Sequence, residues 1–88
     1  MAEIRWTNTA REEYLVLSKN TYDFSVDAAI ELDERIEALQ DRLMLFKRHC
    51  PPHDRIPTMR RCVVTRFVSL IYDVLEEEIT IIPPPPSA

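Results

Sequence analysis

The feature that most constrains this fold is a run of alternating apolar and polar residues over positions 59–82. Successive side chains of an extended strand point to opposite faces of a sheet. One face would therefore carry Val68, Leu70, Tyr72 and Val74, and the other Ser69, Ile71 and Asp73. The pattern predicts an antiparallel meander of three strands, with turns near 65–67 and 75–77, whose apolar face needs a cover.

The residues before this run are expected to supply that cover. A short alternating stretch predicts a strand over 3–6, and a helix is expected over about 9–22. Ser25 is a suitable N-cap for a second helix over about 26–48, which Pro51 and Pro52 would end because they cannot donate the required hydrogen bond. Its apolar residues recur at steps of three and four: Ala29, Leu32, Ile36, Leu39, Leu43 and Phe46. A short coiled coil is the alternative explanation for this spacing.

These elements predict an α+β fold of the order β-α-α-β-β-β, in which a short N-terminal strand and a helix hairpin pack on a small antiparallel sheet. The 88 residues suffice for one domain, expected over 1–82, followed by a proline-rich tail over 83–88. A chain of this size has a small core, so a partner chain or a second copy would add stability. No apolar run approaches the length of a membrane span and no signal peptide is evident, so we expect a cytoplasmic protein without a membrane partner.

The composition excludes several kinds of site. The chain has no glycine, which argues against the glycine-rich loops that cradle nucleotide phosphates, and no cofactor is expected. Without a secretory signal, Cys50 and Cys62 are expected to be reduced thiols, with a disulfide as the alternative. Together with His49 and His53 they match no standard zinc spacing, so no metal site is predicted.

Charge is distributed unevenly along the chain. Positions 47–66 hold six basic residues and one acid, a balance of +5, whereas the rest of the chain has a balance of −9. The candidate binding residues within this segment are Arg55, Arg60, Arg61 and Arg66. They would contact an acidic partner, or else be solvated charges paired with the acidic helices. Because Arg60 and Arg61 are adjacent in a predicted strand, they should point to opposite faces.

No catalytic residue is predicted. His53 has the side chain best suited to proton transfer near neutral pH, but no nucleophile or carboxylate is spaced to pair with it. Tyr72 is expected in the core or in a partner interface, and Trp6 as a core or interface anchor.

Several short motifs occur in an order that resembles the RelE/ParE superfamily of toxins from type II toxin–antitoxin systems, over residues 3–82. They are Ile4-Arg-Trp-Thr-Asn-Thr-Ala10, Ile36-Glu-Ala-Leu39, Cys50-Pro-Pro52, Ile56-Pro57, Arg60-Arg-Cys-Val-Val64 and Ser69-Leu-Ile-Tyr72. The last of these are most similar to the ParE-like branch, whose members are known from plasmid stabilization. The resemblance implies a toxin that a cognate antitoxin neutralises by wrapping across the helices and sheet, with a homodimer or a heterotetramer with the antitoxin as expected assemblies.

Two activities occur in that superfamily: cleavage of messenger RNA on the ribosome, and inhibition of DNA gyrase by binding alone. The chain departs from the ribonuclease pattern at Ser69, where those members commonly place an arginine, and no Tyr, His or Arg follows Tyr72. A net charge of −4 also disfavours docking on ribosomal RNA. The resemblance therefore implies a gyrase inhibitor, with a ribosome-dependent endoribonuclease as the alternative. The run Pro83–Pro86 replaces the aromatic-Asp-Asn-Arg segment of similar proteins, so an inactive remnant that binds only the antitoxin is the third interpretation.

Overall fold

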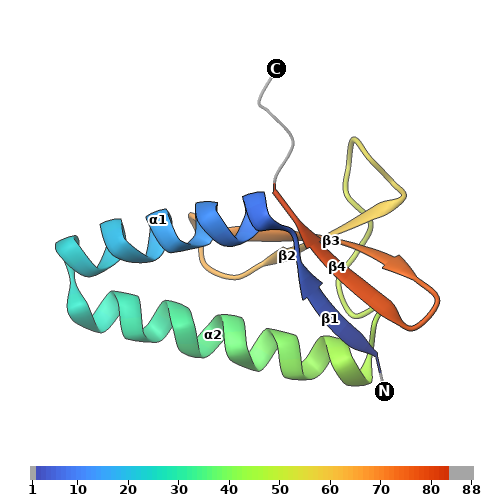
Figure 1. The fold of residues 1–88 in the computed structure, drawn as a ribbon, viewed down its shortest axis with the longest axis horizontal. Coiled ribbons are helices and arrows are strands. Elements are labelled where there is room, and N and C mark those ends of the chain that lie inside the picture. Colours follow the sequence, from blue (N-terminus) through green and yellow to red (C-terminus); the bar gives the residue numbers. More distant parts are fainter. Residues whose placement is uncertain (1, 84–88) are drawn as a thin grey trace.

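The computed structural model describes residues 2–83, and two helices form a hairpin on one side of a four-stranded sheet (Figure 1). The elements are β1 (Glu3–Trp6), α1 (Asn8–Phe24), α2 (Val26–Leu45), β2 (Met59–Val63), β3 (Ser69–Leu75) and β4 (Glu78–Ile82). The predicted α+β class and element order are confirmed. Most of the predicted tail, residues 84–88, lies outside the described residues.

The sheet is mixed, with the strand order β1-β4-β3-β2. The last three strands form the predicted antiparallel meander. The N-terminal strand joins it in parallel beside β4 at one edge, and the amide of Glu3 donates to the carbonyl of Glu77 at 2.8 Å. The helix hairpin makes this possible, because a parallel partner requires a long connection that crosses from one end of the sheet to the other.

Both helix starts are capped by a hydroxyl side chain. The Oγ1 of Thr7 accepts a hydrogen bond from the amide of Ala10, and the Oγ of Ser25 accepts one from the amide of Ala28. Ser25 has extended backbone angles and is the single residue between the two helices, as its predicted N-cap role required. The second helix ends at Leu45, three residues before the predicted end.

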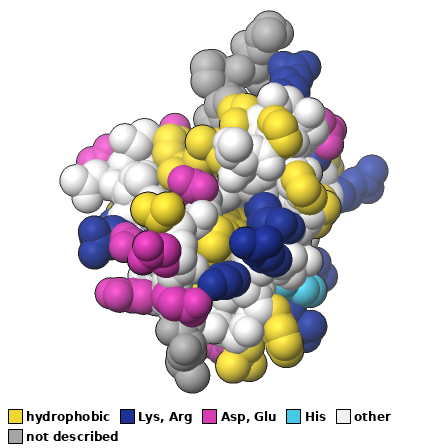
Figure 2. Space-filling view, turned by 90° about the vertical axis from the view of Figure 1, so that its right-hand side faces the viewer, with side chains coloured by type: hydrophobic (Ala, Val, Ile, Leu, Met, Phe, Trp, Pro, Cys, Tyr) yellow, Lys and Arg dark blue, Asp and Glu magenta, His cyan; other side chains and the backbone are white. Residues whose placement is uncertain are grey.

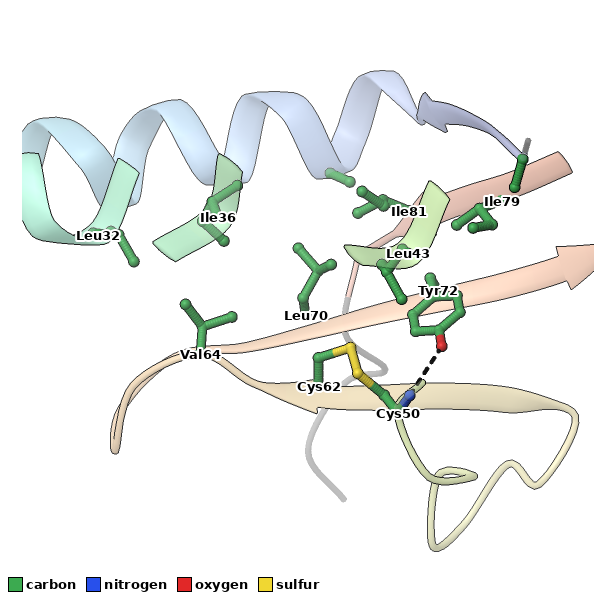
Figure 3. Packing of buried hydrophobic residues seen from close by; sticks show 12 residues of the cluster. Leu32, Ile36, Leu43, Cys50, Cys62, Val64, Leu70, Tyr72, Ile79 and Ile81 are labelled. Atoms are coloured by element: carbon green, nitrogen blue, oxygen red, sulfur yellow. Dashed lines mark hydrogen bonds between the residues drawn. A yellow bond between two sulfur atoms is a disulfide. The ribbon is translucent and has the colours of Figure 1, made fainter. Parts of the chain in front are cut away.

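The core lies between the helix hairpin and the sheet (Figure 3). Its most completely buried side chains come from one helix and two strands: Leu43, Tyr72, Ile79 and Ile81. Burial of each large apolar side chain stabilises the fold by roughly 1.5–3 kcal/mol. The predicted apolar seam of α2 is confirmed at Leu32, Ile36 and Leu43, but it is wrong at Phe46, which is 61% exposed because the helix has already ended.

Cys50 and Cys62 form a disulfide, with their Cα atoms 5.3 Å apart, so the expectation of reduced thiols is wrong. The 46–58 connection, which joins α2 to β2, turns back along the edge of β2 and brings the two cysteines together. Backbone hydrogen bonds fix this path, from Arg61 N to Pro51 O at 3.0 Å and from His53 N to Met59 O at 2.8 Å. Spacing along the sequence alone does not reveal such an edge contact.

The turn between β3 and β4 is formed without glycine. Glu76 adopts a left-handed conformation with φ of 56°, which costs a residue with a Cβ atom about 1 kcal/mol. The Nζ of Lys47 donates to the carbonyl of Glu76 at 2.9 Å and to Oε1 of Glu77 at 2.7 Å. The bond from Lys47 holds the pKa of the Glu77 carboxyl below its usual range. This lysine therefore ties the turn to the 46–58 connection.

Candidate binding surface

The two faces of the sheet have different surroundings. Because side chains alternate along each strand, Cys62, Leu70 and Tyr72 point to the helix-covered face and enter the core. Arg61 and Ile71, which are register partners, point to the outer face on the opposite side. As predicted, the adjacent arginines Arg60 and Arg61 are separated by the sheet.

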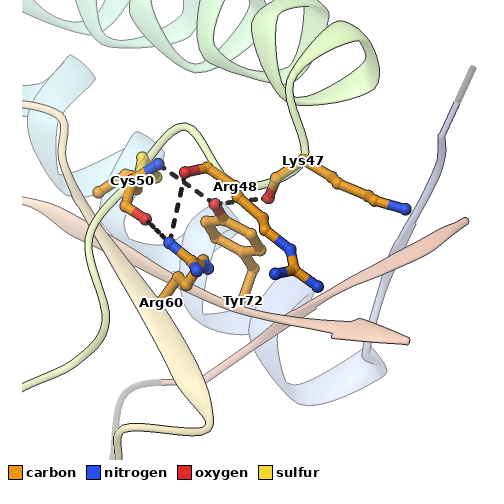
Figure 4. Close-up of a disulfide and its surroundings, with 6 residues drawn as sticks. Lys47, Arg48, Cys50, Arg60 and Tyr72 are labelled. Carbon is orange, nitrogen blue, oxygen red and sulfur yellow. Dashed lines mark hydrogen bonds between the residues drawn. A yellow bond between two sulfur atoms is a disulfide. The ribbon is translucent and has the colours of Figure 1, made fainter. Parts of the chain in front are cut away.

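Arg60 is used inside the fold. Its Nη1 donates to the carbonyl of Cys50 at 2.6 Å and to that of Arg48 at 3.3 Å (Figure 4). Hydrogen bonds from a charged donor to carbonyl oxygens are stronger than neutral ones. Arg60 therefore fixes the start of the 46–58 connection against β2, on the face away from Arg61.

Tyr72 completes the same anchor. Its hydroxyl donates to the carbonyl of Lys47 at 2.9 Å and accepts a long hydrogen bond of 3.4 Å from the amide of Cys50 (Figure 4). The side chain is fully buried. Burial raises the pKa of this phenol above its ordinary value of 10.0, against the opposing effects of the Cys50 amide and the Arg60 charge. The phenol is thus a neutral structural group.

The outer face carries a hollow bordered by both charge and apolar surface. We call the part of it on this face the outer-face hollow, and this part is lined by His53, Arg55, Ile56, Arg61, Ile71 and Ile82. Arg55 and Arg61 are exposed, whereas Ile71 is only 3% exposed although it lies on the face away from the helices. The hollow continues past the start of β3 and the end of β4 to Ala10 and Leu17 of α1.

His53 shapes the loop that overhangs this hollow. Its Nδ1 accepts hydrogen bonds from the amides of Arg55 at 3.0 Å and Ile56 at 3.2 Å. Both bonds tie Nδ1 to the backbone of the loop. The half-buried histidine therefore positions Arg55 and Ile56.

Arg66 lies apart from the other predicted binding residues, in the turn between β2 and β3. Its guanidinium carbon is 5.2 Å from the centre of the Phe67 ring, a cation–π contact on an aromatic side chain that is 86% exposed. Of the four predicted residues, the fold brings Arg55 and Arg61 to one hollow, directs Arg60 to the other face and leaves Arg66 at the turn.

The charge asymmetry of the sequence is also present in space. Figure 2 shows acidic side chains along one side of the molecule, with Lys and Arg side chains at the centre and on the opposite side. Helix α2 carries six acids: Asp27, Glu31, Asp33, Glu34, Glu37 and Asp41. Opposite charges on opposite sides favour a partner whose acidic surface meets the basic side.

Sequence reasoning missed the three isoleucines of the hollow, Ile56, Ile71 and Ile82. The signal that pointed to them was Ile71 itself, an apolar residue on the strand face opposite the predicted apolar face. A large apolar residue there indicates a second covered surface. His53, Arg55 and Ile56 of the 46–58 connection line the hollow together with Ile71.

In the part of the chain that the structure describes, residues 2–83, no group of three or more His, Cys, Asp or Glu side chains is arranged to hold a metal ion. Neither helix within it combines the length and apolar character needed to cross a membrane.

A family model described as the ParE toxin of the type II toxin–antitoxin system, parDE, matches residues 4–82. The chain belongs to the ParE toxin family. The match covers every helix and nearly every strand residue described above, and it confirms the resemblance found in the sequence motifs. For a ParE toxin, membership in a toxin–antitoxin system implies an antitoxin partner. No curated protein sequence matches this ParE toxin.

Proposed function

We propose that this ParE-family toxin acts in the cytoplasm by binding DNA gyrase, without catalysis, and is neutralised by a cognate antitoxin. Residues 1–82 form the domain that carries this activity. The basic outer face makes the contact with the target.

The observation that carries the proposal is that two side chains suited to proton transfer or phosphate binding, Tyr72 and Arg60, are committed to the fold. The hydroxyl of Tyr72 is buried between the Lys47 carbonyl and the Cys50 amide, and Arg60 is bonded to two carbonyl oxygens. A general acid or base must reach the proton that it transfers. These two side chains face the core side of the sheet, away from the exposed Arg55 and Arg61.

The outer-face hollow has the character of a protein-binding surface. Arginine is enriched among residues that dominate interface affinity, especially where apolar surface surrounds it. Arg55 and Arg61 flank the isoleucines of the hollow and are exposed. An acidic surface on the target would pair with both arginines while apolar side chains cover Ile56 and Ile82.

The extension of the hollow toward α1 supports the antitoxin part of the proposal. A single extended segment that follows the hollow would contact the outer face at Arg61 and the first helix at Leu17. Such a segment would cover the target-binding arginines, and neutralisation would follow from direct competition.

Expression of the chain in a bacterial host without its antitoxin tests the proposal. We expect growth arrest with DNA double-strand breaks and intact transcripts, because a trapped gyrase leaves cleaved DNA. Rapid transcript cleavage with intact DNA would support the endoribonuclease instead. Normal growth at a verified level of folded protein would contradict both activities and favour a remnant that only binds antitoxin.

Charge-reversal variants test whether the outer-face hollow is the surface that contacts the target. Arg55→Glu and Arg61→Glu should each reduce growth arrest, and the double variant should abolish it. Lys19→Glu is the matched control, since Lys19 is exposed on α1 and the charge change is identical. Circular dichroism would verify that each variant is folded. Undiminished toxicity of the folded double variant would exclude this surface.

A further inference from the structure

The disulfide encloses most of the proposed binding surface. Cys50 and Cys62 are twelve positions apart, and the surface arginines Arg55 and Arg61 lie between them. His53 and Ile56, which line the outer-face hollow, belong to the same closed loop. Arg66 lies outside this closed loop.

The bond is placed where the 46–58 connection passes the edge of the sheet. Cys62 points from β2 into the core beside Leu70, and Cys50 reaches it from the connection (Figure 3). Both cysteines are buried, at 3% and 6% exposure. The bond therefore fixes the connection on the helix-covered side of the sheet, while His53 and Ile56 of the same connection line the outer-face hollow.

Weaker bonds hold the connection beside the disulfide. They are the hydrogen bonds from Arg60 to the Cys50 carbonyl, from the Cys50 amide to Tyr72, and from the Arg61 amide to the Pro51 carbonyl. Each of them is non-covalent and opens more readily than the disulfide. Loss of the disulfide would thus loosen the connection and leave the helix hairpin and the meander in place.

We propose that the Cys50–Cys62 pair is a thiol–disulfide switch that controls the order of the binding surface. In the oxidised form the connection is held and Arg55 is presented beside Arg61. In the reduced form the connection opens locally, the two arginines lose their fixed arrangement, and affinity for the partner falls because binding must now order them. The effect on affinity depends on the proposed function, but the effect on local order does not.

The chemistry requires a dithiol reductant. One thiolate of the reductant attacks a sulfur of the Cys50–Cys62 bond and forms a mixed disulfide, and its second thiolate then displaces that sulfur. Two electrons and two protons reach the protein, which gains two thiols, and the reductant leaves as a disulfide. Since both cysteines are buried, attack follows an opening of the connection. Disulfides in reducing compartments are typically transient or redox-sensing, so in the cytoplasm the redox state would decide which of the two forms is present.

Hydrogen exchange of the intact chain, oxidised with glutathione disulfide or reduced with dithiothreitol, tests local order. The reporters are the amides bonded within the connection: His53, Arg55, Ile56 and Arg61. The controls are the amides of Thr7 and Val64, bonded elsewhere in the sheet region. We expect reduction to lower protection of the reporters by at least about tenfold more than that of the controls. Equal changes in both groups, or failure of the two cysteines to form the bond under glutathione disulfide, would overturn the proposal.

A disulfide-free variant and a partner assay complete the test. The double variant Cys50→Ala, Cys62→Ala should show the hydrogen exchange of the reduced chain, and dithiothreitol should not change it. If this variant does not fold, the exchange of the oxidised and reduced wild type decides whether the disulfide controls local order. With purified gyrase, the reduced chain should inhibit supercoiling at least about fivefold more weakly than the oxidised chain. If neither form inhibits gyrase, the proposed target is wrong while the exchange result still decides on local order. Equal inhibition by both forms would contradict control of binding.

Discussion

Arg60 and Arg61 are neighbours in β2, yet the two faces of the sheet give them different tasks. On the helix-covered face, Arg60 joins Tyr72 and the disulfide in holding the 46–58 connection against the core. On the outer face, Arg61 is exposed and borders a hollow with Arg55. The same residue type thus serves stability on one side and remains available for contact on the other.

Residue type alone therefore does not define a binding site in this small protein. The connection is anchored on the helix-covered face and overhangs the outer face, so the two faces are physically linked through it. Substitutions on the first face should therefore change stability, whereas those on the second should change binding.

The largest effect is expected from the core itself. Leu43→Ala removes a fully buried side chain between α2 and the sheet and should lower the free energy of unfolding by about 2–5 kcal/mol. Val63→Ala on the outer face is the control, because Val63 is 69% exposed and should change stability by about 0.5 kcal/mol or less. Urea denaturation measures both. Similar losses in the two variants would remove the distinction between the faces.

Reduction of the disulfide should have the next largest effect. A bond that closes a loop with a sequence separation of 12 restricts the unfolded chain and contributes about 3 kcal/mol. Denaturation of the wild type with and without dithiothreitol measures the difference. The Cys50→Ala, Cys62→Ala variant should show no response to the reductant, and a response there would assign the effect to something other than this bond.

Tyr72→Phe should cost about 1–3 kcal/mol, because it leaves the Cys50 amide and the Lys47 carbonyl without their partner. The effect also depends on pH. The folded-state pKa of Tyr72 is raised, so its contribution is complete below the ordinary value of 10.0 and is lost as pH rises above it, where the unfolded phenol ionises first.

The difference in stability between wild type and Tyr72→Phe should therefore shrink with increasing pH above about 10. Urea denaturation across the alkaline range measures this difference. A gap that stays constant or widens with pH would show that the phenol does not titrate as the buried position requires.

The smallest effect compares the two arginines directly. Arg60→Met should cost about 1–2 kcal/mol through loss of its bonds to the Arg48 and Cys50 carbonyls, while Arg61→Met should stay within about 0.5 kcal/mol of wild type. Toxicity should show the opposite order, with the greater loss in Arg61→Met. Equal stability losses would mean that Arg60 is not an anchor.

Much of the fold could be predicted because its signals are local. The N-cap Ser25, the seam from Leu32 to Leu43 and the alternation in β3 each follow from nearby residues. The opposite orientation of Arg60 and Arg61 likewise follows from alternation alone.

The remaining features depend on contacts between distant residues. The disulfide requires Cys50 to meet Cys62 at the sheet edge, and the cover over Ile71 requires the connection to fold across the outer face. The parallel addition of β1 to β4 joins opposite ends of the chain. No short stretch of sequence specifies these contacts, so the grouping of Arg55 with Arg61 required the structure.

Inhibition of DNA supercoiling by purified gyrase tests the central claim most directly. The oxidised wild-type chain and Lys19→Glu should inhibit supercoiling at similar concentrations, and Arg61→Glu should require at least about tenfold more protein. Circular dichroism should show that Arg61→Glu is folded like the wild type although its inhibition is weaker. Equal inhibition by all three proteins, or none by the folded wild type, would contradict the claim that this toxin binds gyrase through the outer face of its sheet.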